Sequence, residues 1–236
     1  MKKLIPIVMA VALVLALGTG IAVANNDGQG HPSAKATAQI AVLNVLSEAQ
    51  TASDDDPDWD AQLDWTLATN ILTQTIKTPN QKDLLIDVSL QSGLYTETNV
   101  KSKGGNKDTS AAVAAVLLRV EVDDAVAYPG MIIFNARAQV LSATLQGILA
   151  DGVVDDYEEI GLIIGTLSVN SFNFIVADLD AGVHTVEVSA LLVTFAASQA
   201  GSAKAKAVIG LGSVTIEEVR MIQGEDWCVG IDTPCP

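Results

Sequence analysis

The stretch GVHTVEVSALLVTFAASQAGSAKAKAVIGLGSVTIEEVRMI, residues 182–222, decides the fold of this chain. Its first run alternates between apolar and polar side chains, as a strand with one buried face does. The apolar series is Val186, Val188, Ala190 and Leu192, and the polar series is Thr185, Glu187 and Ser189. The run ends in a loop at residues 198–202, in which Gly201 can supply a positive φ.

A second alternating run follows this loop. Its inward series is Ala203, Ala205, Ala207 and Ile209, and its outward residues are Lys204 and Lys206. Two such runs joined by a glycine-containing loop predict a β-hairpin. The inward positions then change parity between Ile216 and Val219, so we expect a β-bulge at Glu217-Glu218. The alternative is that the strand ends at Glu217.

The rest of the chain supplies further segments of strand length. They are residues 35–46, where the alanine content makes a helix the rival interpretation, and 66–76, 84–90, 111–122, 131–149 and 168–178. Turn signals recur between them, notably at residues 101–108 and 128–130. This pattern predicts an all-β chain that folds as an antiparallel β-sandwich of jelly-roll-like type.

One short helix is expected near residues 155–164, DDYEEIGLII, because acidic residues crowd its first turn and favour the helix dipole. Residues 112–118 and 190–197 are apolar on both faces of their predicted strands. One face of an antiparallel sandwich strand usually meets water. We therefore expect the helix, loops or another subunit to cover these strands.

The pattern G-x-H-T-V-x-V at residues 182–188, followed by a strand of small residues and by VTIEEVRMI, resembles the closing strands of secreted or phage-type jelly-roll domains. The resemblance covers residues 182–222. It implies a fold and no particular activity.

The first residues have the composition of a secretory signal peptide. Lys2 and Lys3 precede an apolar run at residues 4–17, and Ala22-Val23-Ala24 forms an A-x-A cleavage site. The alternative is a retained membrane anchor, for which the run is shorter than the roughly 20 residues that a span needs. We expect cleavage after Ala24 and a secreted or cell-surface protein. Its parts would be a flexible leader (25–34), one β-sandwich domain (35–223) and a tail (224–236).

The formal net charge is −15. Such a chain repels nucleic acids and anionic membrane surfaces, so neither is expected as a partner. Cys228 and Cys235 are the only cysteines. In an oxidising compartment they are expected to form a disulfide that closes the tail. A zinc site is the alternative, but it lacks further ligands nearby.

Two acidic segments are candidate calcium sites. Residues 151–158 resemble the second half of an EF-hand loop, with ligands at Asp151, Asp155 and Glu158. Gly147 and Leu149 stand where the first two acidic ligands belong, so the same residues also fit a helix N-terminus. The second candidate is the loop that carries Asp54, Asp56, Asp58 and Asp60. A bound cation would relieve the repulsion between these carboxylates, and a hydrated loop is the simpler alternative.

No catalytic set is recognisable, and no cofactor is predicted apart from calcium. His184 falls in the buried series of its strand, which favours a structural histidine over a Ser-His-Asp triad, and the chain has no G-x-S-x-G, HExxH or CxxC motif. Aromatic residues make up only 4% of the chain, which weakens a sugar-binding prediction. The plausible platforms for a sugar ring are Trp59, Trp65, Tyr95 and Trp227.

We therefore predict a secreted or cell-envelope protein with a non-catalytic structural or interaction role, which associates with itself or with an extracellular partner. The second hypothesis is a calcium-stabilised extracellular module that binds a ligand such as a glycan. A secreted hydrolase that uses unrecognised acidic residues ranks third.

Overall fold

The computed structural model describes residues 36–50, 64–101, 106–145 and 159–220, all within the unit His31–Pro236. Its elements are β1 (Ala36–Gln50), the 3-10 turn η1 (Trp65–Leu67), β2 (Thr69–Thr78), β3 (Lys82–Lys101), β4 (Lys107–Val122), β5 (Ala125–Val126), β6 (Ile132–Thr144), β7 (Glu159–Leu179), β8 (Gly182–Ser198) and β9 (Ser202–Val219). Nothing helical in these ranges has the length and apolar content needed to cross a bilayer.

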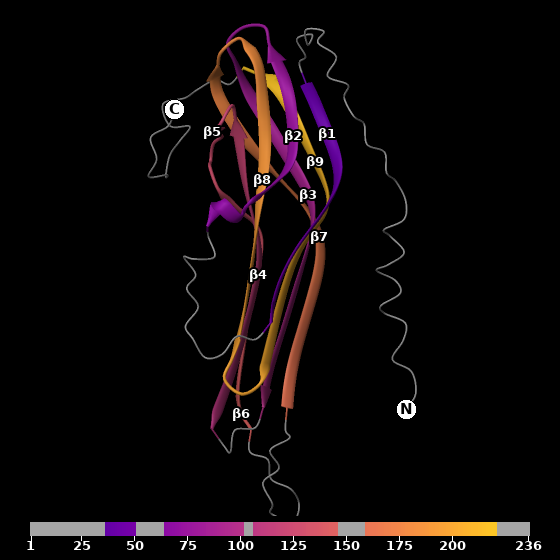
Figure 1. Ribbon diagram of the computed structural model, residues 1–236, viewed down its shortest axis with the longest axis vertical. Coiled ribbons are helices and arrows are strands. Elements are labelled where there is room, and N and C mark those ends of the chain that lie inside the picture. The colour runs from indigo at the N-terminus through magenta and orange to yellow at the C-terminus, as the bar shows by residue number, and fades with distance from the viewer. Residues whose placement is uncertain (1–35, 51–63, 102–105, 146–158, 221–236) are drawn as a thin grey trace, which may run out of the picture. The chain divides into compact units, whose positions relative to one another are not determined.

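The strands form two antiparallel sheets (Figure 1). One sheet has the order β1-β9-β3-β7, and the other has the order β2-β8-β4 with β5 and β6 both pairing to β4. Eight long strands that alternate in this way between two sheets make a jelly roll. The predicted antiparallel β-sandwich is confirmed, and so is the strand assignment of residues 36–46 over its helical rival.

The predicted hairpin at residues 182–209 is wrong, because β8 and β9 lie in different sheets. β8 pairs with β2 and β4, whereas β9 pairs with β1 and β3. Their connection crosses from one layer to the other, where Ala200 N donates to Asp108 Oδ1 at 2.9 Å. The alternating pattern is the same for a hairpin within one sheet and for a connection between two sheets, because both strands turn their apolar series toward the same interior.

The predicted bulge at Glu217-Glu218 is also wrong. The register of β9 against β3 runs without interruption from the Asp83–Val219 pair to the Leu90–Gly212 pair, and it shifts immediately afterwards, at Gly210-Leu211. This shift explains why the buried series moves from the odd-numbered residues before Gly210 to the even-numbered ones after it. Gly201 does not adopt a positive φ, which among the described glycines occurs at Gly130.

The predicted helix near residues 155–164 is wrong over its described part. Residues 159–164 begin strand β7, which pairs with β3 from Glu159–Lys101 to Leu179–Lys82. Residues 155–158 lie outside the described residues. An acidic first turn favours a helix only locally, and here the long pairing partner β3 overrides that preference. The segment predicted at residues 131–149 is strand β6 as far as Thr144.

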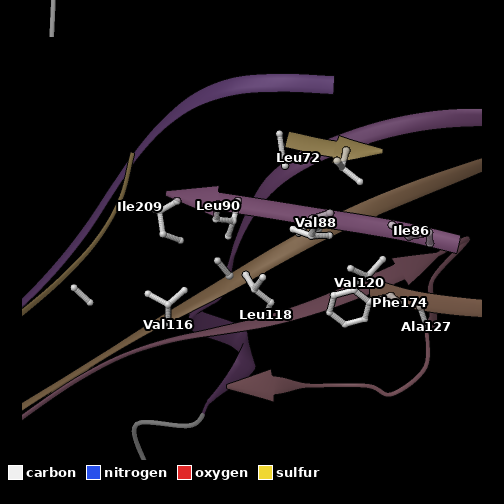
Figure 2. Close-up of a cluster of buried hydrophobic side chains, with 14 of the residues drawn as sticks. Leu72, Ile86, Val88, Leu90, Val116, Leu118, Val120, Ala127, Phe174 and Ile209 are labelled. Atoms are coloured by element: carbon white, nitrogen blue, oxygen red, sulfur yellow. The ribbon is translucent and has the colours of Figure 1, made fainter. Parts of the chain in front are cut away.

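The core fills the space between the two sheets. Figure 2 shows Ile86, Val88 and Leu90 of β3 projecting into the same interior as Val116, Leu118 and Val120 of β4, together with Phe174 of β7. All of these side chains are fully buried. Each contributes about 1.5–3 kcal/mol by leaving water, so the sheets are held mainly by this alternating apolar series.

A smaller apolar cluster lies on the outer face of β4 and β8. It consists of Ala115, Leu117, Leu191 and Val193, with Trp65 and Ala68 packed against it. The guanidinium of Arg119 lies 4.8 Å from the centre of a Trp65 ring. A local segment of the chain therefore covers this part of the two-faced strands, one of the arrangements that the sequence left open.

Polar side chains of β6 cross the interior to β3 and β7. Asn135 Nδ2 donates to Ser92 Oγ at 2.9 Å and to Ser168 Oγ at 3.0 Å. Gln139 Nε2 donates to the Leu162 carbonyl oxygen at 2.7 Å. A buried polar group costs free energy unless it is hydrogen-bonded. These bonds therefore supply partners for the inward-facing polar side chains of β6, and they also fix the position of β7.

Candidate interaction surface

Most of the predicted site residues lie outside the described residues. These are Asp54, Asp56, Asp58 and Asp60, then Asp151, Asp155 and Glu158, and the predicted disulfide partners Cys228 and Cys235, together with the signal peptide and leader. The calcium, disulfide and export hypotheses therefore stay predictions, as do the domain boundaries. Within the described ranges, no three His, Cys, Asp or Glu side chains come together as a metal site would require.

Two of the aromatic residues considered for sugar binding are described. Trp65 packs beside Arg119, and its Nε1 donates to Met131 Sδ at 3.0 Å. The hydroxyl of Tyr95 donates to Glu97 Oε2 at 2.6 Å. Burial, and then the Glu97 carboxylate, raise the pKa of Tyr95 to about 12. Both side chains are thus engaged by neighbours of their own chain.

His184 lies in a row of groups that superficially resembles a catalytic triad. Its Nδ1 is 2.7 Å from Asp123 Oδ2, and its Nε2 is 3.1 Å from Thr78 Oγ1 and 2.9 Å from the Asp180 carbonyl oxygen. Thr78 is only 1% exposed, and its hydroxyl donates to that same carbonyl at 2.8 Å. A nucleophile must be reachable and must pass its proton to the histidine, so this row has a structural role.

The row ties three connections together. Asp123 belongs to the turn between β4 and β5, Asp180 to the turn between β7 and β8, and Thr78 ends β2. Asp123 also accepts a hydrogen bond from Thr185 N at 2.8 Å. Burial alone would raise the pKa of Asp123, but the hydrogen bonds from His184 and Thr185 outweigh it, so that the pKa is lowered.

We expect acid to weaken this row. A carboxyl whose pKa is lowered in the folded state stabilises it above the unfolded-state pKa, and the contribution is lost as the pH falls through the folded-state value. Asp123→Asn should therefore lower the urea midpoint at pH 7, and its effect should shrink progressively as the pH falls below about 4, the usual pKa of an aspartate in the unfolded chain. Paired urea titrations of both proteins across this range test it, and a difference that does not change with pH would contradict it.

An apolar surface that is largely exposed lies on the outer face of the β1-β9-β3-β7 sheet. We call it the apolar belt. It consists of Ile40, Val42 and Leu46 on β1, Val208 and Leu211 on β9, and Leu167 and Val169 on β7. These residues alternate with inward-facing neighbours such as Val45, Ala207 and Ile209, which places them on the outer face.

The strand register makes the belt continuous across the sheet. Leu46 lies opposite Val208, Val208 lies opposite Gly93 of β3, and Gly93 lies opposite Leu167. A Cβ atom at Gly93 would be 2.7 Å from Val208 Cγ1 and 3.5 Å from Leu167 Cδ1. The side chains on either side therefore close over the glycine, and the belt has no gap at β3.

Ionic side chains border the belt. Glu48 accepts from Lys206 Nζ at 2.9 Å and from Lys204 Nζ at 3.1 Å. Its pKa is lowered to about 2, first by the hydrogen bond from Lys206 and then by those from Gln50 and Lys204. Within the belt, Ile40 is 79% exposed and Val169 is 72% exposed. An apolar patch with a charged rim is typical of a protein–protein interaction site.

Sequence reasoning did not identify this surface. It singled out residues 112–118 and 190–197, whose outer apolar residues include a cluster covered by Trp65. In residues 160–169, apolar residues occur at both odd and even positions, which in a strand would indicate an apolar outward face. The helix prediction for this segment did not lead to that interpretation. The outward-facing positions of β1 also carry alanines and polar residues. Ile40 and Val42 therefore do not stand out in the sequence as part of an exposed apolar surface.

A hollow opens beside the belt between β1 and β8. It is lined by Val45, Leu46, Ser47, Leu67, Thr69 and residues 190–194. The hydroxyls of Ser47 and Thr194 lie 2.9 Å apart and bond to each other. None of its lining residues is charged or a histidine, so they provide no general acid or base.

No protein-family model matches the chain, and no curated protein matches it in sequence. Among solved structures, it is similar to a structure of the infectious bursal disease virus Gx strain, with 10% identity, a TM-score of 0.21, and coverage of 78% of this chain and 38% of the other. For the T13 particle of the same virus the values are 11%, 0.22, 83% and 42%. The chain thus spans about two fifths of these viral chains. Scores this low carry no argument, and the fold assignment rests on the strand order.

Proposed function

We propose that this protein is an exported, non-catalytic structural or interaction protein that assembles with copies of itself through the apolar belt. The observation that carries the proposal is the belt itself, which runs across all four strands of one sheet in a chain of net charge −15. Export is inferred from the composition of residues 1–24. The structural role of the His184 row and the uncharged lining of the hollow support a role without catalysis.

A second copy is the occupant that the lack of charge favours. The belt itself carries no charge, and the lysines beside it, Lys204 and Lys206, are already ion-paired with Glu48 of the same chain. Two belts packed face to face would therefore bury apolar side chains without burying an unpaired charge. A twofold interface uses the same patch on both copies, so one such belt on each chain is sufficient.

Lysine substitutions within the belt test this function. We expect Ile40→Lys together with Leu211→Lys to weaken self-association at least about tenfold, because each buried aliphatic side chain contributes about 1.5–3 kcal/mol and tenfold corresponds to about 1.4 kcal/mol. Both sites lie away from β7. The two lysines change the net charge from −15 to −13, so a loss of association could not come from added repulsion.

The matched control is Ala36→Lys together with Gln50→Lys. Both residues are exposed at the ends of β1, outside the belt, and the change in charge is the same. Sedimentation velocity over a hundredfold range of concentration would give the association constants. A native chain that stays monomeric throughout that range would refute self-assembly, and equal effects of the two double substitutions would refute the role of the belt.

A further inference from the structure

We propose that the free edge of β7, from Ile160 to Asn173, pairs antiparallel with the same residues of a second copy and joins two four-stranded sheets into one of eight strands. The inference rests on the proposed self-association and adds a second contact to it, made by backbone groups at the edge of the sheet.

The hydrogen-bonding direction along β7 follows from a single bridge. Ile175 N donates to the Tyr128 carbonyl oxygen and Tyr128 N donates to the Ile175 carbonyl oxygen, both at 2.9 Å. Tyr128 pairs on the side of β7 away from β3, so the backbone groups of Ile175 point to that side. In an antiparallel pair, successive residues alternate between the two sides.

The register between β7 and β3 is uninterrupted from Glu159 to Val176. The other odd-numbered residues must therefore direct their N–H and C=O groups to the free edge, while the even-numbered residues bond to β3. The edge-facing residues are Gly161, Ile163, Gly165, Leu167, Val169, Ser171 and Asn173. Among the described residues, Tyr128 is the one that pairs with this side of β7. It pairs with Ile175, which lies beyond residues 160–173.

Sequence features that protect exposed edges are missing from this segment. Edge strands are normally blunted by lysine, proline, bulges or short length. Residues 160–173 contain no charge and no proline, have no register shift, and extend about 45 Å at the usual rise of a strand. The edge strand β1, by contrast, carries a bulge next to Asn44, whose φ is 48°.

The segment suits an identical partner. In a chain of net charge −15, this uncharged strand is where two copies approach each other with least repulsion. An antiparallel alignment centred on Leu167 places Leu167 opposite its copy and Leu162 opposite Phe172 of the second copy. Glu159 then lies opposite Ile175, beyond the paired segment, and it is already ion-paired with Lys101 at 3.8 Å. Each edge donor of one copy meets an acceptor of the other.

Amide hydrogen exchange of the full chain provides a readout specific to edge pairing. At dilution, where the chain is monomeric, we expect the edge-facing amides of residues 161–173 to exchange rapidly and the even-numbered amides to be protected by β3. On concentration, the odd-numbered amides should gain at least about tenfold protection and the even-numbered ones little. Packing through the belt alone would not produce this alternation.

A proline on the free edge tests the same bonds. Ser171→Pro removes an N–H that points away from β3, a position that edge strands tolerate, and we expect at least about tenfold weaker association. Ser171→Ala keeps the N–H and should associate like the native chain. Ile163→Lys is a second variant that keeps the N–H, places a charge on the edge and should also weaken association. Circular dichroism checks that each variant is folded.

The outcomes separate this inference from the proposed function. Association without the alternating protection, or association unaffected by both Ser171→Pro and Ile163→Lys, would overturn edge pairing and leave assembly through the belt standing. Odd-numbered amides already protected in the monomer would show that residues of the same chain occupy the edge, which also overturns the inference. No association at any concentration would overturn both.

Discussion

Gly201→Ala should destabilise the sandwich by about 3 kcal/mol or more, the upper range for overpacking of a site that cannot relax. A Cβ atom at this position would overlap the carbonyl oxygen of Asn99 and lie 2.6 Å from its carbonyl carbon and 3.0 Å from Val100 Cα. All three atoms belong to the backbone of β3, so no side chain can rotate out of the way. The connection from β8 to β9 would have to move away from β3.

Gly130→Ala is the matched control for this substitution. Nothing lies within 4 Å of a Cβ atom built at Gly130, but its φ is +92°. The expected cost is about 1–2 kcal/mol, which is the penalty of a left-handed backbone for a residue with a side chain. Urea unfolding followed by circular dichroism measures both. Equal losses for the two variants would show that close approach to Asn99 is not what requires glycine at position 201.

Phe174→Ala should cost about 3–5 kcal/mol, the usual range for removing a buried aromatic ring and leaving a cavity. Phe174 is fully buried in the main core and lies opposite Ile86 of β3. The substitution removes a ring that contacts the interior from the edge strand β7. A large loss of stability is therefore expected even though, among the described residues, β3 is the one strand that pairs with β7 along most of its length.

Phe172→Ala provides a comparison within the same strand. The two rings meet edge to face with centroids 5.3 Å apart, yet Phe172 is 38% exposed. Because much of its surface already meets water, we expect a loss of only about 1 kcal/mol. Thermal and urea unfolding of both variants measures the difference. A Phe172→Ala loss as large as that of Phe174→Ala would contradict the placement of β7 at the edge of the sheet.

Period-two alternation accounts for much of what could be predicted from the sequence. It located the strands that became β1, β3, β8 and β9 and identified His184 as a buried histidine, which is only 6% exposed. Alternation succeeds because a strand that covers a core must direct every second side chain inward. It cannot report which strand is the hydrogen-bonded neighbour, and for that reason the connection at residues 199–201 was mistaken for a hairpin turn.

The candidate interaction surface was beyond this kind of reasoning. Leu46 precedes Leu167 by 121 residues, and Leu167 precedes Val208 by 41 residues. Only the registers of three strand pairs place these side chains in one row. The acids that precede an apolar run predict a helix near residues 155–164, of which residues 159–164 are described. Pairing with residues 96–101 of β3 gives this segment a different structure.

The sequence by itself determined that this chain is built of strands around one apolar layer, because alternation and turn residues are local properties. It also determined the acidity of the chain and the absence of a recognisable catalytic motif. Only the tertiary structure decided the jelly-roll order, the crossing between layers at Gly201, the belt and the position of β7 at the end of its sheet among the described strands. These features depend on which distant strands pair with each other. The free energy of strand pairing is a sum over many contacts between residues of different segments, so no single segment determines it.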